Sequence, residues 1–103
     1  MGLNKILTKQ EQEALTPDEI LKALMEGNKR FTSDQFQSRD HKAMKQSAVG
    51  GQYPKAVILS CVDSRVPVEI VFDQGIGDVF VARVAGNFEN TDILGSMEYA
   101  CRV

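Results

Sequence analysis

Hydrophobic residues between positions 16 and 33 recur at the spacing of an α-helix. Ile20, Leu24 and Phe31 lie four and seven residues apart, which predicts one apolar stripe along an amphipathic helix. The sequence Thr16-Pro17-Asp18-Glu19 precedes the stripe, and a capping threonine, a proline at the first helical position and a glutamate at the third all favour a helix start. We therefore expect a helix that runs to about residue 33, with its stripe packed in the core.

Farther along the chain the apolar residues form short continuous runs. Residues 56–59, A-V-I-L, show no alternation, which is typical of a strand buried on both faces, as in a parallel sheet. Residues 79–84, V-F-V-A-R-V, predict a second strand. A short helix predicted over residues 68–73 separates the two strands, so we expect them to run parallel. With a final helix that begins at Asn90 or Thr91, the expected fold class is α/β: a parallel β-sheet core with flanking helices.

The two ends of the chain give weaker structural signals than its middle. Residues 1–15 contain a capping sequence at residues 8–11 but few apolar positions, so a helix there would need another surface to pack against. We interpret residues 1–15 as an N-terminal helical arm and residues 16–103 as one α/β domain. The last predicted helix has neither a C-terminal glycine nor another stop signal before Val103, which predicts a truncated domain.

Five polar or reactive side chains follow the first predicted strand, where open α/β sheets place their ligand crevice: Ser60, Cys61, Asp63, Ser64 and Arg65. A thiolate at Cys61 is a strong zinc ligand, and Asp63, two residues on, lies on the same side of an extended chain and can approach the same ion. The guanidinium of Arg65 is suited to a bidentate pair with Asp63. The alternative is a buried Cys61 thiol beside an ordinary ion pair in a turn, and the residues alone favour neither.

The composition is that of an ordinary globular protein, with 103 residues of which 43% are hydrophobic and 25% charged. Because the net charge is −2 and no basic cluster occurs, we expect neither nucleic acid nor an anionic membrane as a partner. The sequence contains no secretory signal and no stretch long enough to span a bilayer, so we expect a cytoplasmic protein. In that reducing compartment Cys61 and Cys101 should remain free thiols or act as ligands.

Residues 61–67, C-V-D-S-R-V-P, closely resemble the first signature of the β-class carbonic anhydrases, zinc enzymes that interconvert carbon dioxide and bicarbonate. The resemblance extends to Gln52-Tyr53-Pro54, to residues 69–87 and to residues 98–100, so it covers nearly the whole chain. It implies the fold of that family, Zn²⁺ as the cofactor and carbon dioxide and bicarbonate as the small-molecule substrates. Related folds process carbonyl sulfide or carbon disulfide, and the sequence leaves that choice open.

The resemblance also implies roles for five residues of this sequence. Cys61 would be a zinc ligand. Asp63, oriented by Arg65, would accept a hydrogen bond from zinc-bound hydroxide and assist proton transfer, or would bind the zinc itself in a closed state. Gln52 would donate a hydrogen bond to the substrate, and Phe80 would form an apolar wall of the carbon dioxide pocket. The alternatives are that Gln52 is an ordinary loop residue and Phe80 an ordinary core aromatic.

Part of the family's zinc site has no counterpart in this sequence. The other two protein ligands come from an H-x-x-C motif that follows the last predicted helix, beyond Val103. The single histidine, His41, lies in a polar segment and matches no family ligand, so we expect it to be a solvated residue of a short helix over residues 41–49, with Asp40 as its capping residue.

Two functions follow from the resemblance. The first is that of a carbonate dehydratase, a zinc-dependent lyase, with little or no activity from residues 1–103 alone because ligands are missing. The alternative is a non-catalytic scaffold or dimerisation module with the same fold. The family further suggests a homodimer or a higher homo-oligomer, in which residues 1–15 reach across the partner subunit.

Overall fold

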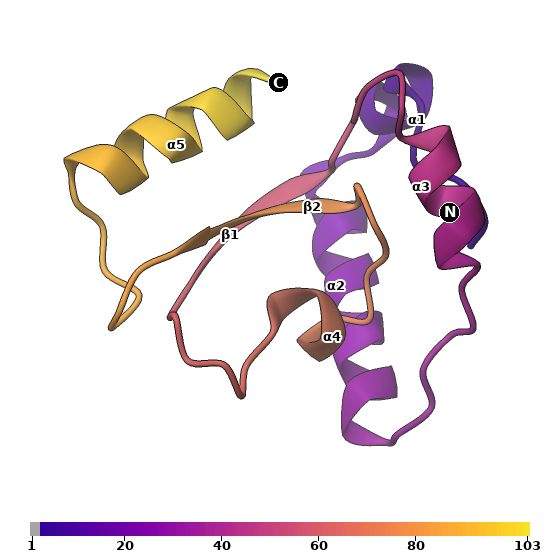
Figure 1. Cartoon of the computed structure of the whole chain (residues 1–103), viewed down its shortest axis with the longest axis horizontal. Helices are drawn as coiled ribbons and strands as arrows, with labels where there is room; N and C mark the ends of the chain where they lie inside the picture. The colour runs from indigo at the N-terminus through magenta and orange to yellow at the C-terminus, as the bar shows by residue number, and fades with distance from the viewer. Residues whose placement is uncertain (1–2) are drawn as a thin grey trace.

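A computed structural model describes residues 3–103 of the chain. Within these residues, two strands lie between helices on either side (Figure 1). In chain order the elements are α1 (Lys9–Ala14), α2 (Pro17–Thr32), α3 (His41–Ser47), β1 (Ala56–Ser60), α4 (Val68–Val71), β2 (Val79–Arg83) and α5 (Thr91–Arg102). No helix among residues 3–103 has the length and apolar character needed to cross a membrane.

The two strands form a parallel sheet, as predicted. Ala56 pairs with Val79 and Ser60 pairs with Arg83, so the strands are in register along their whole length and end together. The connection between them contains α4, because parallel strands need a crossover that returns to the same end of the sheet. α5 lies on one side of the strands, and α2 and α4 lie on the other (Figure 1). This arrangement confirms the predicted α/β fold class with flanking helices.

Three helices begin where their capping residues predicted. At the start of α2, the Glu19 N–H donates to Thr16 Oγ1 at 3.2 Å and the Thr16 N–H donates to Glu19 Oε1 at 3.1 Å, which completes a capping box. Asp40 caps α3 through the Ala43 N–H at 3.0 Å. Of the two capping residues considered for α5, the structure uses Asn90, whose Oδ1 accepts the Ile93 N–H at 2.9 Å.

The strand β1 is not buried on both faces, which corrects the expectation from its continuous apolar run. All five of its residues are only half-buried. The sheet has two strands within residues 3–103, so each strand keeps one unpaired edge and the helices cover its faces incompletely. The buried apolar side chains are spread over the arm, three helices and β2: Ile6, Leu7, Met44, Val68, Ala82 and Ile93.

The N-terminal arm lies against the rest of its own chain. Ile6 and Leu7 are buried, and the Ile6 N–H donates to Ser47 Oγ at 2.9 Å next to the end of α3. In α1, Gln12 Nε2 donates to the carbonyl of Pro54 at 2.6 Å. The division of the chain into an arm and a domain remains a prediction, and residues 1–2 of the predicted arm lie outside the described residues.

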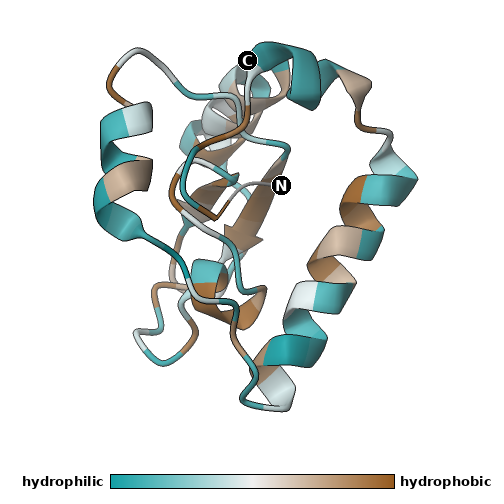
Figure 2. Ribbon diagram, turned by 90° about the vertical axis from the view of Figure 1, so that its right-hand side faces the viewer, coloured by the Kyte–Doolittle hydropathy of each residue, from teal (hydrophilic) through white to brown (hydrophobic). Residues whose placement is uncertain are grey.

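The helix α2 packs very closely against α4. Hydrophobic and hydrophilic stretches both occur along α2, the long helix at the right of Figure 2. Its buried residue is Gly27, where an added Cβ would lie 1.8 Å from the carbonyl oxygen of Phe72. Beside it, Asn28 Nδ2 donates to the carbonyl of Val71 at 3.0 Å. A glycine at residue 27 therefore allows α2 to reach the C-terminal end of α4.

A buried carboxylate, Asp73, also joins α2 to the turn after α4. It accepts hydrogen bonds from Arg30 Nε at 2.6 Å, from Arg39 Nη1 at 2.6 Å and from the Gln37 N–H at 3.0 Å. Burial by itself raises the pKa of Asp73, but the Gln37 N–H and the two guanidinium groups outweigh burial and lower that pKa below its ordinary value. These ion pairs hold α2, the segment before α3 and the α4 turn together.

Candidate active site

The candidate site lies at the carboxyl end of the sheet, in residues 61–66. Because β1 and β2 end in register, the segments that follow the two strands lie side by side. The Val84 N–H donates to the carbonyl of Ser60 at 3.0 Å, which extends the pairing by one step beyond the strands. The structure therefore brings Cys61, Asp63 and Arg65 to one edge of the sheet, as the sequence predicted.

The thiol of Cys61 is half-exposed and accepts a hydrogen bond from the Gly86 N–H at 3.3 Å. This N–H, together with those of Asp63 and Val62, lowers the pKa of Cys61 below its ordinary value, against the opposing effects of burial and of the Asp63 charge. Gly86 has a φ of +84°, a left-handed conformation that glycine adopts readily. The environment therefore favours the thiolate, which is the form that binds metal ions.

The predicted pair of Asp63 and Arg65 is present and bidentate. Arg65 Nε lies 3.0 Å from Asp63 Oδ1 and Arg65 Nη2 lies 2.7 Å from Asp63 Oδ2, while the Arg65 N–H also donates to Oδ1 at 2.9 Å. The Arg65 side chain is the main cause of a lowered pKa at Asp63. Both carboxylate oxygens are thus engaged by Arg65, and Asp63 is ionised at neutral pH.

Two further residues at the site were not identified from the sequence as site residues. Arg83 donates from Nε to the carbonyl of Cys61 at 2.7 Å and from Nη2 to the carbonyl of Asp63 at 2.6 Å. The other is Gly86, which donates to the Cys61 thiol. Their position in the sequence could have identified them, because both come at or just after the end of the second strand. The carboxyl ends of parallel strands meet at one edge of a sheet, so residues after both strands lie together there.

Gln52 and Phe80 do not lie with Cys61. Gln52 is exposed and comes before β1, whereas Cys61 follows it, so they lie at opposite ends of that strand. Phe80 is the second residue of β2, three positions before Arg83 and therefore about 10 Å from the carboxyl edge. The roles proposed for Gln52 and Phe80 remain predictions.

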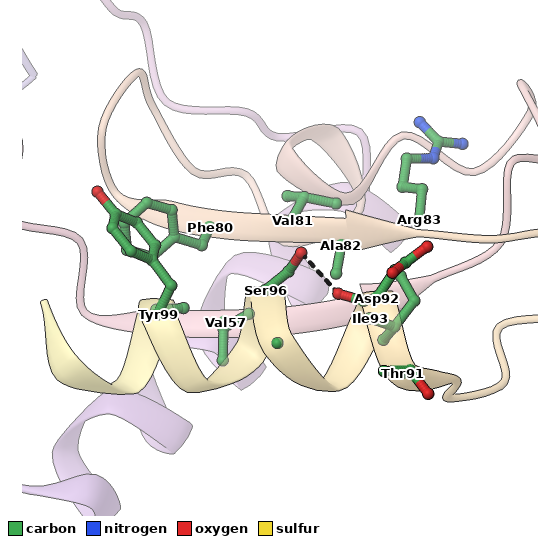
Figure 3. Close-up of a pocket in the computed structure, with 12 residues that line it drawn as sticks. Val57, Phe80, Val81, Ala82, Arg83, Thr91, Asp92, Ile93, Ser96 and Tyr99 are labelled. Carbon is green, nitrogen blue, oxygen red and sulfur yellow. Dashed lines mark hydrogen bonds between the residues drawn. The ribbon is translucent and has the colours of Figure 1, made fainter.

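Phe80 lies in an open groove between the sheet and α5. Its ring packs edge-on against that of Tyr99, with the ring centroids 5.9 Å apart and an interplanar angle of 67°. The groove has a volume of about 800 Å³ and is lined largely by β2 and α5 (Figure 3). Apolar groups at its floor include Val57, Phe80 and Ile93.

The described residues supply only part of a zinc site. Cys61 and Cys101 are both free thiols, as predicted, and Cys101 is exposed on α5. His41 is exposed at the start of α3, as expected of a solvated residue. Among residues 3–103, no three histidine, cysteine, aspartate or glutamate side chains gather so as to hold a metal ion. The thiol of Cys61 suits zinc as one ligand, but a complete set of protein ligands does not form here.

Comparisons with known proteins give a consistent family. The family model described as "Carbonic anhydrase" matches residues 56–103. Carbonic anhydrase 2 of Mycobacterium tuberculosis is 51% identical over an alignment of 86 residues, and the match covers 80% of this chain and 40% of the relative. A carbonic anhydrase of Mycolicibacterium smegmatis is 46% identical over 83 residues, with the same coverage of 80% and 40%. The chain thus spans about 40% of the length of these curated relatives.

A solved structure supports the fold. The β-carbonic anhydrase CcaA shares 32% sequence identity with this chain and superimposes with a TM-score of 0.54. The match covers 78% of this chain and 41% of that protein.

Proposed function

The chain belongs to the β-class carbonic anhydrase family, and on that premise we propose that it serves the zinc-dependent, reversible hydration of carbon dioxide to bicarbonate, the reaction of a carbonate dehydratase. One observation carries this proposal. At the carboxyl end of β1, a thiol with a lowered pKa lies two residues from a carboxylate that an arginine holds by two contacts. The names of the curated relatives point to the same reaction.

Cys61 is the residue that would hold zinc. Zinc, when bound, makes hydroxide available at neutral pH by lowering the pKa of a bound water to about 7. Catalytic zinc sites ordinarily have three protein ligands, and residues 3–103 do not gather three candidates. The further ligands would therefore come from outside these residues, and we expect the chain alone to bind zinc weakly and to hydrate carbon dioxide slowly.

Asp63 would act as the acceptor beside the reacting groups. Because Arg65 lowers its pKa, Asp63 stays ionised at neutral pH and can only accept hydrogen bonds. The bidentate contact fixes the plane of the carboxylate, so Asp63 can accept a hydrogen bond from one donor and orient it, which would assist proton transfer. The Arg65 side chain is 86% exposed, so this pair can open without disturbing the core. Opening would free the oxygens of Asp63 for the closed state described above.

The substrate contacts would come from a second copy of the chain. Gln52 and Phe80 lie away from the carboxyl edge of their own sheet, so a site that contains Cys61 together with both requires another subunit. We therefore propose a homodimer or a higher homo-oligomer. In that assembly, the apolar ring of Phe80 would form a wall for carbon dioxide, and residues 1–15 would exchange their contacts with their own chain for contacts with the partner.

One observation favours a second candidate function. Residues 3–103 do not gather a complete set of metal ligands, and Asp63 has both oxygens engaged. A non-catalytic scaffold or dimerisation module would need neither a complete set of metal ligands nor a free carboxylate oxygen. This alternative leaves the lowered pKa of the Cys61 thiol without a use, so we place it second.

Zinc affinity tests the proposal directly. Zinc binding by the chain would be measured by competition with a chromophoric chelator, for the parent and for Cys61→Ser and Cys101→Ser. Because the proposal assigns zinc to the Cys61 thiolate, Cys61→Ser should weaken binding by about tenfold or more. Cys101→Ser is the matched control, since it removes an exposed thiol on α5 and should leave zinc affinity unchanged.

One outcome would contradict the assignment of zinc to Cys61, and a second would contradict the expectation that the chain alone hydrates carbon dioxide slowly. Equal zinc affinities for the parent and Cys61→Ser would remove Cys61 from the site, and the scaffold function would then be preferred. Carbon dioxide hydration would be followed by a pH indicator after rapid mixing. A rate from the chain alone that equals the rate of a complete relative would show that no ligand from elsewhere is needed.

A further inference from the structure

We propose that Arg83 is a positioning residue, which holds the backbone of residues 61–63 so that Cys61 and Asp63 keep a fixed relation at the sheet edge. The inference rests on the proposed function of that edge. One guanidinium binds the carbonyl oxygens of Cys61 and Asp63, at 2.7 Å and 2.6 Å. Charged donors make short and strong hydrogen bonds of this kind, and the planar fork of arginine fixes the direction of both.

The register of the sheet explains how Arg83 reaches this backbone. Arg83 is the last residue of β2 and pairs with Ser60, the last residue of β1. Figure 3 shows its side chain on the side of β2 that faces away from α5. It therefore extends past the end of the neighbouring strand to the first carbonyl groups of the segment that follows.

The other hydrogen bonds of this segment are mainly local. The Arg65 N–H donates to Asp63 Oδ1 at 2.9 Å, and the Val66 N–H donates to the carbonyl of Asp63 at 3.2 Å. Both bonds shape the turn, but neither ties it to the sheet. Arg83 connects this turn to β2 by two hydrogen bonds, which it donates to the carbonyl groups of Cys61 and Asp63. The proposed function uses the side chains of these same two residues.

Arg83 thereby acts at a distance from the thiol and the carboxylate themselves. Its two bonds span the residue between Cys61 and Asp63, so they fix the separation of these two positions along the backbone. The Gly86 N–H holds the Cys61 sulfur from the same side of the sheet edge, because residue 86 follows β2 as well. Without Arg83, the thiol would keep the Gly86 bond while the turn that contains Asp63 loses its connection to β2.

Hydrogen exchange followed by mass spectrometry tests this inference without any metal. In Arg83→Gln, the amides of residues 62–66 should exchange at least tenfold faster than in the parent, while those of α2 keep their parental rates. Arg83→Lys should restore part of the protection, because one ammonium keeps the charge but lacks the fork. Arg102→Gln, a change at an exposed arginine near the end of α5, is the matched control and should leave residues 62–66 unchanged.

The same variants separate positioning from general stabilisation. Equal exchange of residues 62–66 in Arg83→Gln and the parent would overturn the inference. So would faster exchange in α2 and β1 to the same extent as in the turn, because Arg83 would then stabilise the whole fold. If Arg83→Gln does not fold, Arg83→Lys decides: parental exchange of residues 62–66 in that variant overturns the role of the fork.

Cadmium binding links the inference to the function and keeps the two distinguishable. Cadmium would be titrated and followed by the charge-transfer absorption of its thiolate bond. Arg83→Gln should weaken cadmium binding about tenfold, as loss of an outer support typically does, and Arg83→Lys should recover part of the loss. Equal affinities in all three proteins overturn the positioning role. Absence of cadmium binding in the parent overturns the proposed function, while the exchange rates still decide whether Arg83 holds the turn.

Discussion

Replacement of Gly27 by alanine should destabilise the chain, although alanine is the better helix former. An alanine Cβ would lie 1.8 Å from the carbonyl oxygen of Phe72, whereas ordinary contacts begin at 3.4 Å, so the two backbones would have to separate by about 1.6 Å (3.4 − 1.8). Strain of this kind costs about 3 kcal/mol, and the helix propensity of alanine offsets about 1 kcal/mol. We therefore expect Gly27→Ala to lower the free energy of unfolding by about 2 kcal/mol.

The chain contains a matched control in α5. An added Cβ at Gly95 meets no atom within 4 Å, so Gly95→Ala should gain helix propensity without strain and stabilise the fold by about 1 kcal/mol. Urea unfolding followed by far-UV circular dichroism would give both values by linear extrapolation. The close approach of α2 and α4 would be refuted if Gly27→Ala had the same free energy of unfolding as the parent. It would also be refuted if the two variants changed that free energy by the same amount in the same direction.

Further predictions concern the buried carboxylate and a helix cap. Asp73→Ala should lower the free energy of unfolding by about 3–5 kcal/mol, because Arg30 and Arg39 lose their shared partner, while Asp18→Ala at an exposed position should cost far less. The pKa of Asp73 is lowered in the folded state, so the ionised carboxylate stabilises the fold fully at pH values above the ordinary pKa of about 3.9. This stabilisation is lost as the pH falls through the lower pKa of the folded state. A free energy of unfolding that does not change with pH in acid would contradict this prediction. Thr16→Ala should lower the free energy of unfolding by about 1 kcal/mol, measured by thermal unfolding, because the Glu19 N–H loses its acceptor. Thr91→Ala is the control, and an equal loss of stability in that variant would speak against the capping box.

The features that the sequence predicted well depend on neighbouring residues. Thr16, Asp40 and Asn90 cap helices by accepting an N–H three residues later, so each signal is complete within four positions. The pair of Asp63 and Arg65 is equally local, because the two residues are separated by one position. The parallel pairing of the strands joins residues 23 positions apart (79 − 56), but it followed from the order of the elements, a short helix between two apolar runs.

The features that it did not predict depend on contacts between distant segments. Arg83 binds carbonyls 20 and 22 positions earlier, and Gly86 binds a thiol 25 positions earlier, so both require the register of the two strands. The half-burial of β1 depends on how many strands and helices cover it, which its own four apolar residues do not specify. The contact of Gly27 with Phe72 likewise joins α2 to a turn 45 positions later (72 − 27).

The open edges of the sheet affect how the polypeptide behaves at high concentration. Each strand has one hydrogen-bonded neighbour within residues 3–103, so its other side carries unpaired N–H and C=O groups. A strand from a neighbouring molecule can bond to such an edge, and the rate of this addition rises with concentration, while the rate of folding within one molecule does not. Dilute solutions therefore favour isolated folded molecules, and concentrated ones favour growth of intermolecular sheets.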